Sequence, residues 1–448
     1  MRYTVRMDFK PNADSLDVVW GSDADRASAE RPAPGADAAT SGGQATVLVA
    51  GDWASCRCYA DAADRSPDDL YGSLSADIRE ADLSIVSLEC ALAGDTPVLK
   101  EGPNLKGTPD SPRALRSAGF DVATLGNNHA ADFGEEGLAE TVRLCDVAGL
   151  AVTGAGTVPE TLLIRDVAGT KLGILNLAEP EGPEPDRPGV HLASAYDHRV
   201  ASRVGRLKAQ CDVALVIVHG GREYVPVPPF YWYDHLLSIA DAGADLVVAH
   251  HPHVPQGGTI RRTDDGREVP VFFSTGNFVF RPALPRPNEV PPHTGDGYLV
   301  RFGLARGAIS GLELVPYRID GGDGVRAIAT EDAERFARMM RELSAELVDR
   351  DRVIAWYDAI VDFQWERHYR ARFERFTRAW LDDGDRDALR WVRSHHSSPT
   401  HARLIDRALM RIQNGTFGTA PPELTDRLGQ WYAGRWPCGG FGRAVADA

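Results

Sequence analysis

Residues 245–257 read DLVVAHHPHVPQG, and this stretch contains both a strand and a cluster of histidines. The run DLVVA has the length and the apolar, β-branched composition of a strand that is buried in a sheet. It leads directly into His250, His251 and His253, which place three imidazoles within four positions. Imidazoles add little to packing, and Pro252 fixes the backbone between them. We therefore interpret the stretch as a core strand whose carboxyl end carries metal ligands.

Four other predicted strands also end in residue types that bind metal ions. These residues are Asp52 after ATVLVAG, Glu89 in SIVSLECAL, Asn127, Asn128 and His129 after DVATLG, and His219 and Glu223 in VIVHGGRE. In an α/β sheet the loops at the carboxyl ends of the strands converge, so we expect these side chains at one rim. Carboxylates, an amide oxygen and imidazoles suit Mn, Fe or Zn, and two carboxylates can hold a close pair of ions. The sequence thus predicts one or two divalent transition-metal ions.

The composition excludes several classes of function. Of the 448 residues, 43% are hydrophobic and 25% are charged, which is ordinary for a soluble globular protein. The formal net charge of −15 argues against a nucleic-acid binder, because phosphate backbones are bound by basic faces. No segment approaches the roughly 18 consecutive apolar residues of a membrane span, and the N-terminus lacks the apolar core of a secretory signal. We expect a cytoplasmic protein that acts on a small molecule, without nucleic acid and without a membrane span.

Three regions are expected along the chain. Residues 1–44 are predicted to be a flexible lead-in, since their second half is rich in Ala, Asp, Pro, Gly and Ser and has no apolar period. Residues 45–325 alternate strands with helices and form the main domain. Residues 326–448 are predicted to be a mainly helical C-terminal appendage rich in aromatics and Arg. For this appendage a packing cap, a lid and the contact of a homo-oligomer remain alternatives.

Within the main domain, local signals place individual elements. A helix is expected over residues 66–81, with Ser66 as its N-cap and Pro67 at its first position. The chain changes later from strand–helix units to paired strands, with an Asp265–Gly266 turn and a second turn near Gly307. This mixture predicts two packed mixed sheets with helices outside.

The ordered set of strand-end motifs resembles the CapA (PgsA-like) family of poly-gamma-glutamate capsule biosynthesis proteins, within the calcineurin-like metallophosphoesterase superfamily. The resemblance covers about residues 46 to 320. It rests on GD at 51–52, SLECAL at 87–92, LKGTPDSPRALRSAGFDVATLGNNHAADFGEEGL at 105–138, VHGGREY at 218–224, ADAGADLVVAHHPHVPQG at 240–257 and FFSTGNFVF at 272–280. It implies an α/β fold, a four-layer α/β/β/α sandwich of the calcineurin-like metallophosphoesterase type, which agrees with the strand pattern.

The resemblance also implies a role for each strand-end residue. Asp52 and His253 would bind a first ion, and Glu89 would bridge to a second ion. Asn128, His219 and His251 would complete the shell of that second ion. His129 would be an acid or electrostatic helper beside the metals.

Further residues are predicted around this centre. The family-type pattern HxGxEY at 219–224 supplies Glu223 and Tyr224. Glu223 is suited to orient a ligand histidine, to bind an amine or to act as a general base, and these roles stay open. Asn277, which follows a strand in STGNF, is expected to line the same cleft. The predicted substrate-binding residues are Asn127, His250, Tyr224 and Asn277, and the predicted catalytic residues are His129 and Glu223.

Two departures from the superfamily pattern bear on the activity. The usual Asp-x-His of the first motif is Asp52-Trp53-Ala54 here, so one histidine ligand is missing, and the bridging carboxylate is Glu89 instead of Asp. The expected activity is metal-dependent hydrolysis, by water attack on a phosphoester or amide bond of a small molecule or glutamyl-type substrate. Two alternatives from other classes remain: an acyl or phosphoryl transferase of a biosynthetic pathway, and a non-catalytic binding or scaffold protein for polyglutamate or capsule synthesis.

Overall fold

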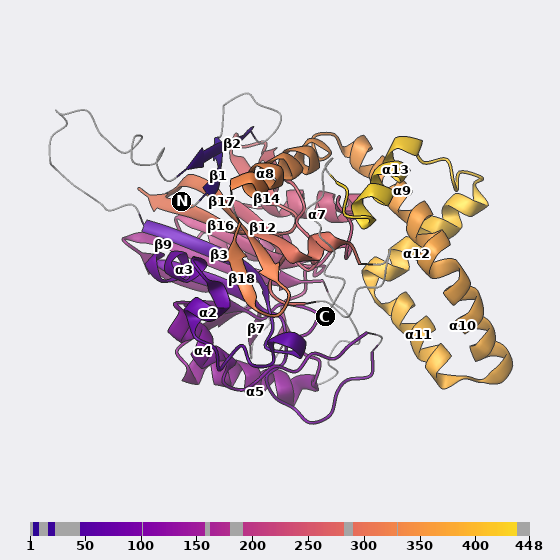
Figure 1. Ribbon diagram of the computed structural model, residues 1–448, viewed down its shortest axis with the longest axis horizontal. Coiled ribbons are helices and arrows are strands. Elements are labelled where there is room, and N and C mark those ends of the chain that lie inside the picture. Colours follow the sequence, from indigo (N-terminus) through magenta and orange to yellow (C-terminus); the bar gives the residue numbers. More distant parts are fainter. Residues whose placement is uncertain are drawn as a thin grey trace.

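The protein is described by a computed structural model, in which residues 3–8, 17–22, 45–100, 102–156, 162–179, 191–281, 290–328 and 330–436 are described. It is a mixed α/β structure with a helical C-terminal region, as the sequence predicts. Figure 1 shows the sheets and their flanking helices on one side and the last helices, in yellow, projecting from the other. Among the residues described, no helix is long and apolar enough to cross a lipid bilayer.

The first of two large sheets has ten strands and is partly parallel. In spatial order its strands are β2 (Asp17–Ser22), β1 (Tyr3–Asp8), β17 (Ala308–Asp320), β16 (Asp296–Ala305), β3 (Ala45–Trp53), β4 (Leu83–Leu88), β5 (Val122–Thr124) and β6 (Ala151–Thr153), with β15 (Asn277–Val279) beside β3 and β18 (Gly324–Ala327) beside β17. Because β3, β4, β5 and β6 run parallel, their carboxyl ends lie along one edge of the sheet.

The second sheet has six strands, four of them parallel. In spatial order they are β13 (Gly258–Arg262), β14 (Glu268–Phe272), β12 (Leu246–His250), β11 (Val213–His219), β9 (Thr170–Ala178) and β8 (Leu163–Val167). A further pair of short strands, β7 (Ala155–Gly156) and β10 (His191–Leu192), forms a separate two-stranded sheet. The parallel strands β11 and β12 both end in a histidine, so this sheet also presents imidazoles at one edge.

The two sheets pack face to face, and the alternation of side chains along β3 shows how. Val47 and Val49 belong to the same buried cluster as Ile217 of β11, between the sheets. Leu48 and Ala50 belong to a second cluster, on the other face of the first sheet. The period of two in a strand therefore gives β3 two apolar faces, which explains why its sequence is almost continuously apolar.

Helices cover the outer faces of both sheets (Figure 1). The helices on the first sheet are α2 (Pro67–Tyr71), α3 (Leu74–Glu80), α4 (Ser111–Ala118) and α5 (Gly134–Val147), and those on the second are α6 (Val200–Lys208) and α7 (Phe230–Asp241). Two short 3₁₀ turns, η1 (Arg57–Tyr59) and η2 (Pro292–Gly295), lie in the connecting loops.

The C-terminal region is helical throughout the part that the structure describes. It contains α8 (Thr330–Ala345), α9 (Arg350–Gln364), a π-helical turn η3 (Trp365–Tyr369), α10 (Arg370–Asp383), α11 (Arg386–Ser397), α12 (Pro399–Gln413) and α13 (Pro422–Tyr432). Phe336, Met340 and Leu343 of α8 are buried in the same apolar cluster as Val47 and Ile217. In contrast, α10 buries none of its side chains. The expected boundary at residue 325 falls within β18, and the division into domains stays a prediction.

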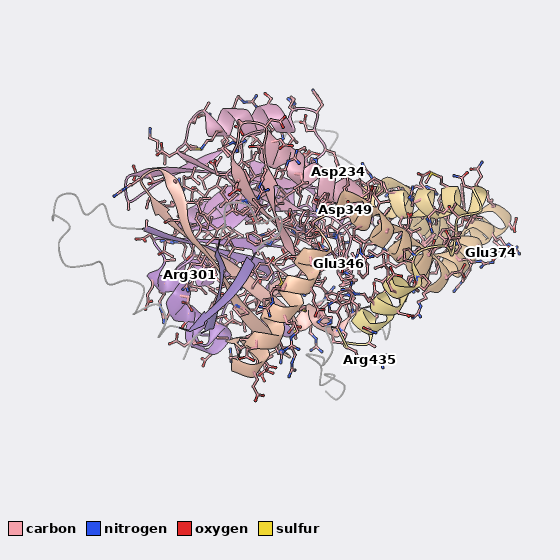
Figure 2. The ribbon with its side chains drawn as sticks, turned by 90° about the horizontal axis from the view of Figure 1, so that it is seen from above. Asp234, Arg301, Glu346, Asp349, Glu374 and Arg435 are labelled. Carbon is pink, nitrogen blue, oxygen red and sulfur yellow. The ribbon has the colours of Figure 1, made fainter. Side chains whose placement is uncertain are left out.

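Glu346, just after α8, joins α8 to the later C-terminal helices. Its Oε2 accepts hydrogen bonds from Trp356 Nε1 at 2.6 Å and from Arg352 Nε at 2.7 Å, and its Oε1 pairs with Arg427 of α13. Figure 2 shows Glu346 at the junction, with Glu374 of α10 at the far end of the helical region. One carboxylate thus fixes α9 and α13 to the end of α8.

Most local expectations are confirmed, and one helix is divided. The turns at Asp265–Gly266 and near Gly307 join β13 to β14 and β16 to β17. Ser66 is an N-cap, since its hydroxyl accepts a hydrogen bond from the Asp69 backbone nitrogen at 3.2 Å. The helix expected over 66–81 is interrupted at Gly72, whose φ of 54° cannot continue a right-handed helix, and it forms α2 and α3 instead.

Two segments of the lead-in expected over residues 1–44 form strands, and the division of the chain into regions stays a prediction. β1 and β2 form an antiparallel pair, and β1 extends the first sheet by pairing with β17. An edge strand offers unpaired backbone groups that a distant segment can satisfy, and composition does not reveal such a pairing. The other residues of this segment lie outside the described residues. The strand β3 begins at Ala45, where the main domain is expected to start.

Asn176 of β9 connects the two sheets near their functional edge. It is fully buried, and its Oδ1 accepts a hydrogen bond from the Gly126 backbone nitrogen, after β5, at 2.6 Å. Its Nδ2 donates to the Ile217 carbonyl of β11 at 3.2 Å. Gly154 lies against this amide, and a Cβ added there would overlap Asn176 Oδ1 and lie 2.5 Å from the Gly126 nitrogen.

The contact at Gly154 yields a stability prediction with a matched control. Gly154 and Gly169 have similar positive φ values of 88° and 83°, but a Cβ at Gly169 would meet nothing within 4 Å. Both Ala variants should lose about 1–2 kcal/mol for the left-handed backbone, and Gly154→Ala should lose a further ~1–3 kcal/mol for the overlap. Urea unfolding followed by tryptophan fluorescence measures both losses. Equal losses in the two variants would show that the Asn176 contact is not tight.

Candidate metal centre

The strand ends of both sheets bring carboxylates and imidazoles together. Asp52 lies near the end of β3, and Glu89 follows β4 in the first sheet. His219 ends β11, and His251 and His253 follow β12 in the second sheet. All five side chains are at most 3% exposed, although each is of a type that usually contacts water. The convergence predicted from the sequence is therefore present.

The distances between these groups suit shared ions better than direct hydrogen bonds. Glu89 Oε1 lies 3.5 Å from His219 Nε2 and 3.8 Å from His253 Nε2. Asp52 Oδ1 lies 3.6 Å from His219 Nδ1, and Asp52 Oδ2 lies 3.7 Å from His253 Nδ1. Two ligand atoms that are each about 2.1 Å from one ion lie roughly 3–4 Å from each other. The separations are thus those of donors arranged around a cation.

Three sets of ligand atoms are close enough to hold an ion, with all atoms of each set within 4.8 Å of one another. They are Glu89 with His219 and His251, Asp52 with Glu89 and His253, and Glu223 with His251 and His253. Glu89 is shared by the first two sets, which is the arrangement needed for a carboxylate that bridges two ions. These buried groups could hold a metal ion, and nothing in them selects one metal.

Burial sets the protonation of the centre. It raises the pKa of Asp52 to about 7, although hydrogen bonds from Ser87 and from the His251 backbone nitrogen lower this pKa. It lowers the pKa of His251 to about 3 and that of His219 and His253 well below the ordinary value. The imidazoles are therefore neutral at pH 7, which is the form that binds metals. Asp52 Oδ1 and His219 Nδ1, both buried, make no hydrogen bond to any described residue, which leaves them available as ligands.

The backbone of the histidine loop is strained. His251 and His253 have φ values of 100° and 57°, and the nearby Tyr224 has a φ of 64°. Non-glycine residues in this region cost of order 1–3 kcal/mol each and are concentrated at functional sites. The strain directs both imidazoles toward the carboxylates of the other sheet, and Tyr224 stacks on His253 with 5.9 Å between ring centroids.

Asn128 and His129, predicted from the loop after β5, also lie at the centre. Asn128 Oδ1 is 2.9 Å from His219 Nε2, so its amide oxygen lies on the same side of His219 as Glu89. His129 Nε2 is 4.0 Å from Glu89 Oε1. Both residues therefore lie where the sequence placed them, and their roles stay predictions.

The four predicted substrate-binding residues mainly position other groups. Asn127 Nδ2 donates to the Leu88 carbonyl at 2.8 Å, and its Oδ1 accepts from the His129 nitrogen. His250 Nδ1 is 2.9 Å from Thr275 Oγ1, and His250 belongs to none of the three ligand sets. Asn277 Oδ1 is 2.8 Å from His253 Nδ1 and orients that ring. Substrate contact by these residues and by Tyr224 stays a prediction.

Two residues of the centre were not predicted from the sequence. Asp132 Oδ2 lies 2.7 Å from His129 Nδ1, and Asp132 Oδ1 pairs with Lys100 Nζ. Lys100 Nζ also donates to the Asn128 carbonyl at 3.3 Å. The spacing of His129 and Asp132, three positions apart, is a local signal that points to this pair. No comparable signal exists for Lys100, which comes from a separate loop.

The ligand sets predict which histidine the metal needs. His251→Ala should lower the affinity for Mn²⁺ or Zn²⁺ by at least ~100-fold, because it removes an imidazole that belongs to two sets. The adjacent and equally buried His250 is the matched control, since its ring faces Thr275. Metal content per chain, measured by mass spectrometry after dialysis of both Ala variants, checks this. Equal metal loss in the two variants would contradict the assignment.

Comparisons with known proteins agree with these motifs. The family model described as "Bacterial capsule synthesis protein PGA_cap" matches residues 46–282, just over half of the chain. The chain is 28% identical over 254 residues to the capsule biosynthesis protein CapA of Bacillus anthracis, covering 53% of this chain and 57% of that protein. It is 27% identical over 266 residues to the PGA biosynthesis protein CapA of Bacillus subtilis (strain 168), covering 56% and 63%.

Two further similarities extend the comparison. A probable polyglutamine synthesis accessory protein of Mycobacterium tuberculosis is 30% identical over 220 residues, covering 44% of this chain and 55% of that protein. The chain thus spans less than two thirds of the length of the curated relatives it matches. A hypothetical protein from Thermus thermophilus has a solved structure with a TM-score of 0.38 and 18% identity, covering 61% of this chain and 99% of that one. A TM-score this low supports no conclusion.

The family match includes all five strand ends of the centre, from Asp52 to the histidines after β12, and also Asn277. The relatives named for capsule, PGA or polyglutamine synthesis agree with that match. The chain therefore belongs to the PGA_cap family of bacterial capsule synthesis proteins, the family that its motifs resemble.

Proposed function

We propose that this chain is a metal-dependent hydrolase built on a four-layer sandwich of the calcineurin-like metallophosphoesterase type. The proposal rests on one observation. The side chains of Glu89 and Asp52 are buried and lie close to the imidazoles of His219, His251 and His253. Two buried carboxylates this close are costly without a compensating cation. The mixed oxygen and nitrogen donors fit Mn, Fe or Zn.

The residues divide between two ion positions. Glu89, His219 and His251, assisted by Asn128, would hold one ion, and Asp52, Glu89 and His253 would hold the other. The second position has fewer ligands, because Ala54 stands where a histidine is usual in the superfamily and is buried beside β15. Glu223, grouped with His251 and His253, supplies a further carboxylate on that side. A bound divalent ion supplies a Lewis acid that polarises a substrate oxygen and lowers the pKa of water.

His129 is proposed to act on the leaving group. The Asp132 carboxylate accepts the hydrogen bond of His129 Nδ1 and so fixes the ring orientation and the tautomer. The Nε2 atom then faces the Glu89 side of the centre, from which a leaving oxygen or nitrogen can be protonated or stabilised. Lys100 pairs with the other oxygen of the same carboxylate, Asp132 Oδ1, and so helps to fix the group that holds the imidazole.

The scissile bond is proposed to belong to a small, glutamyl-type molecule or a phosphoester. Names of relatives refer to capsule, PGA and polyglutamine synthesis, which favours an amide of glutamate. The residues of the centre serve attack on carbon or on phosphorus equally. Transfer of the acyl or phosphoryl group to an amine or alcohol, instead of to water, needs the same residues. The identity of the product distinguishes this transfer from hydrolysis.

The proposal is tested with γ-glutamyl-p-nitroanilide, p-nitrophenyl phosphate and bis-p-nitrophenyl phosphate. The chain loaded with Mn²⁺ or Zn²⁺ should hydrolyse one of these classes, and Glu89→Gln should reduce kcat/KM by at least ~10³-fold because the bridging carboxylate is lost. Added glycine or glycerol reveals a transferase if it enters the product. A chain that binds no metal and turns over none of the three compounds would be a binding or scaffold protein, and the proposal would fail.

The His129–Asp132 pair gives a second catalytic prediction. Asp132→Asn should lower kcat by about 10²–10³-fold, because the amide can hold the ring in the wrong tautomer. KM and metal content should stay unchanged, since Asp132 belongs to none of the ligand sets. The double variant with His129→Gln should be no slower than His129→Gln alone, because both act through one ring. Asp110→Asn, at an exposed ion pair on α4, is the control, and additive losses would contradict the pairing.

A further inference from the structure

Arg222 lies beside the candidate metal centre and contacts the C-terminal region. It stands in the HxGxEY stretch, at a position that the pattern does not specify, between His219 and Glu223. Its side chain is buried, with 7% exposed. An arginine in a protein is always charged, so this guanidinium is a buried cation next to the centre.

The contacts of Arg222 come from helices far along the chain. Its Nε donates to Gln364 Oε1 at 2.9 Å, its Nη2 donates to Tyr369 Oη at 2.7 Å, and its Nη1 lies 3.2 Å from His401 Nδ1. Gln364 is in turn bonded to Tyr432 Oη of α13 at 3.1 Å. The end of α9, the π-helical turn η3, α12 and α13 thus converge on one residue of the motif. π-helical turns within helices occur often at functional sites.

All of these partners of Arg222 are neutral. Burial, followed by the charge of Arg222, lowers the pKa of His401 well below its ordinary value, so the imidazole carries no charge that could repel the guanidinium. The Gln364 amide and the Tyr369 hydroxyl do not compensate a positive charge. Among the described residues the guanidinium is held by these neutral hydrogen-bond partners. Burial lowers the pKa of Arg222, but the neighbouring Glu223 carboxylate acts on it through its charge, which raises this pKa, and Glu223 is also grouped with His251 and His253 as a candidate metal ligand.

The other buried arginines of the described chain behave differently. Arg203 pairs with Asp197 at 2.7 Å, and Arg411 pairs with Asp362 at 2.8 Å. Arg222 is the exception among the three. A buried cation that lacks a direct ion pair is unfavourable, and the neighbouring Glu223 belongs to a candidate ligand set with His251 and His253. If Glu223 binds a metal ion, an anionic group from outside the chain would compensate the charge of Arg222. Three of its five N–H groups are used, which leaves one on each Nη for an incoming oxygen.

We propose that Arg222 binds an anionic oxygen group of the substrate, a carboxylate or a phosphate, beside the candidate metal centre. The planar guanidinium suits two-point binding of such groups. The C-terminal helices provide the surrounding Gln364, Tyr369 and His401, so this region completes the substrate site. The inference deepens the proposed function, since it assigns the substrate an anionic group remote from the scissile bond.

Binding without turnover tests the proposal independently of hydrolysis. Isothermal titration calorimetry on the full, metal-loaded chain uses glutarate, inorganic phosphate and the neutral analogue glutaramide. Arg222→Gln should weaken glutarate or phosphate binding by at least about tenfold, with metal content and melting temperature unchanged. Glutaramide should bind the variant and the parent equally. A loss of affinity for glutarate in the variant identifies a carboxylate site, and a loss of affinity for phosphate identifies a phosphate site.

Controls separate substrate binding from a structural role. Arg403→Gln, on the exposed side of α12, removes a cation near Tyr231 and should leave anion binding unchanged. If Arg222→Gln does not fold, Arg222→Lys and Tyr369→Phe carry the test, since the first keeps the charge and the second keeps the ring. Both variants should lower the affinity for the anion by several-fold, while the affinity for glutaramide stays the same. The proposal is overturned if the parent binds neither anion at millimolar concentration, or if the folded variants bind both as the parent does.

Discussion

The burial of Glu89 and Asp52 is the constraint on which the rest of the structure depends. Two carboxylates at the ends of neighbouring strands are removed from water, and the imidazoles that meet them come from the other sheet. The two sheets must therefore pack with these strand ends at the same edge. The amide of Asn176 stabilises that arrangement, because it bonds both the loop after β5 and the strand β11. Stability and chemistry thus depend on the same few contacts.

The sequence predicts the parallel strands well because they are buried on both faces. Runs such as VALVIVH leave no ambiguity about a core strand, and the residue after each run identifies the edge of the sheet. The candidate ligand residues Asp52, Glu89, His219, His251 and His253 could be proposed for the same reason. What the residues themselves could not give was their relative distance, which the packing of two sheets decides.

The unpredicted contacts join segments that are far apart in the chain. Asn176 and Gly126 are 50 positions apart, and Arg222 and Tyr369 are 147 apart. No periodicity links such pairs, because each partner satisfies its own local pattern. The division of the helix at Gly72 and the pairing of β1 with β17 escaped prediction for related reasons. The first depends on one backbone angle, and the second depends on an open sheet edge.

The left-handed backbone at His251, His253 and Tyr224 has an evolutionary consequence. Glycine and asparagine fit such φ values with less strain, yet neither supplies an imidazole or a phenol. A substitution to glycine or asparagine at these positions would thus stabilise the fold and would also remove the side chains of the candidate metal centre. Selection for folding alone would therefore favour glycine or asparagine at these positions over His251, His253 and Tyr224. A variant with glycines at these positions would keep the sheets and lose the candidate metal centre.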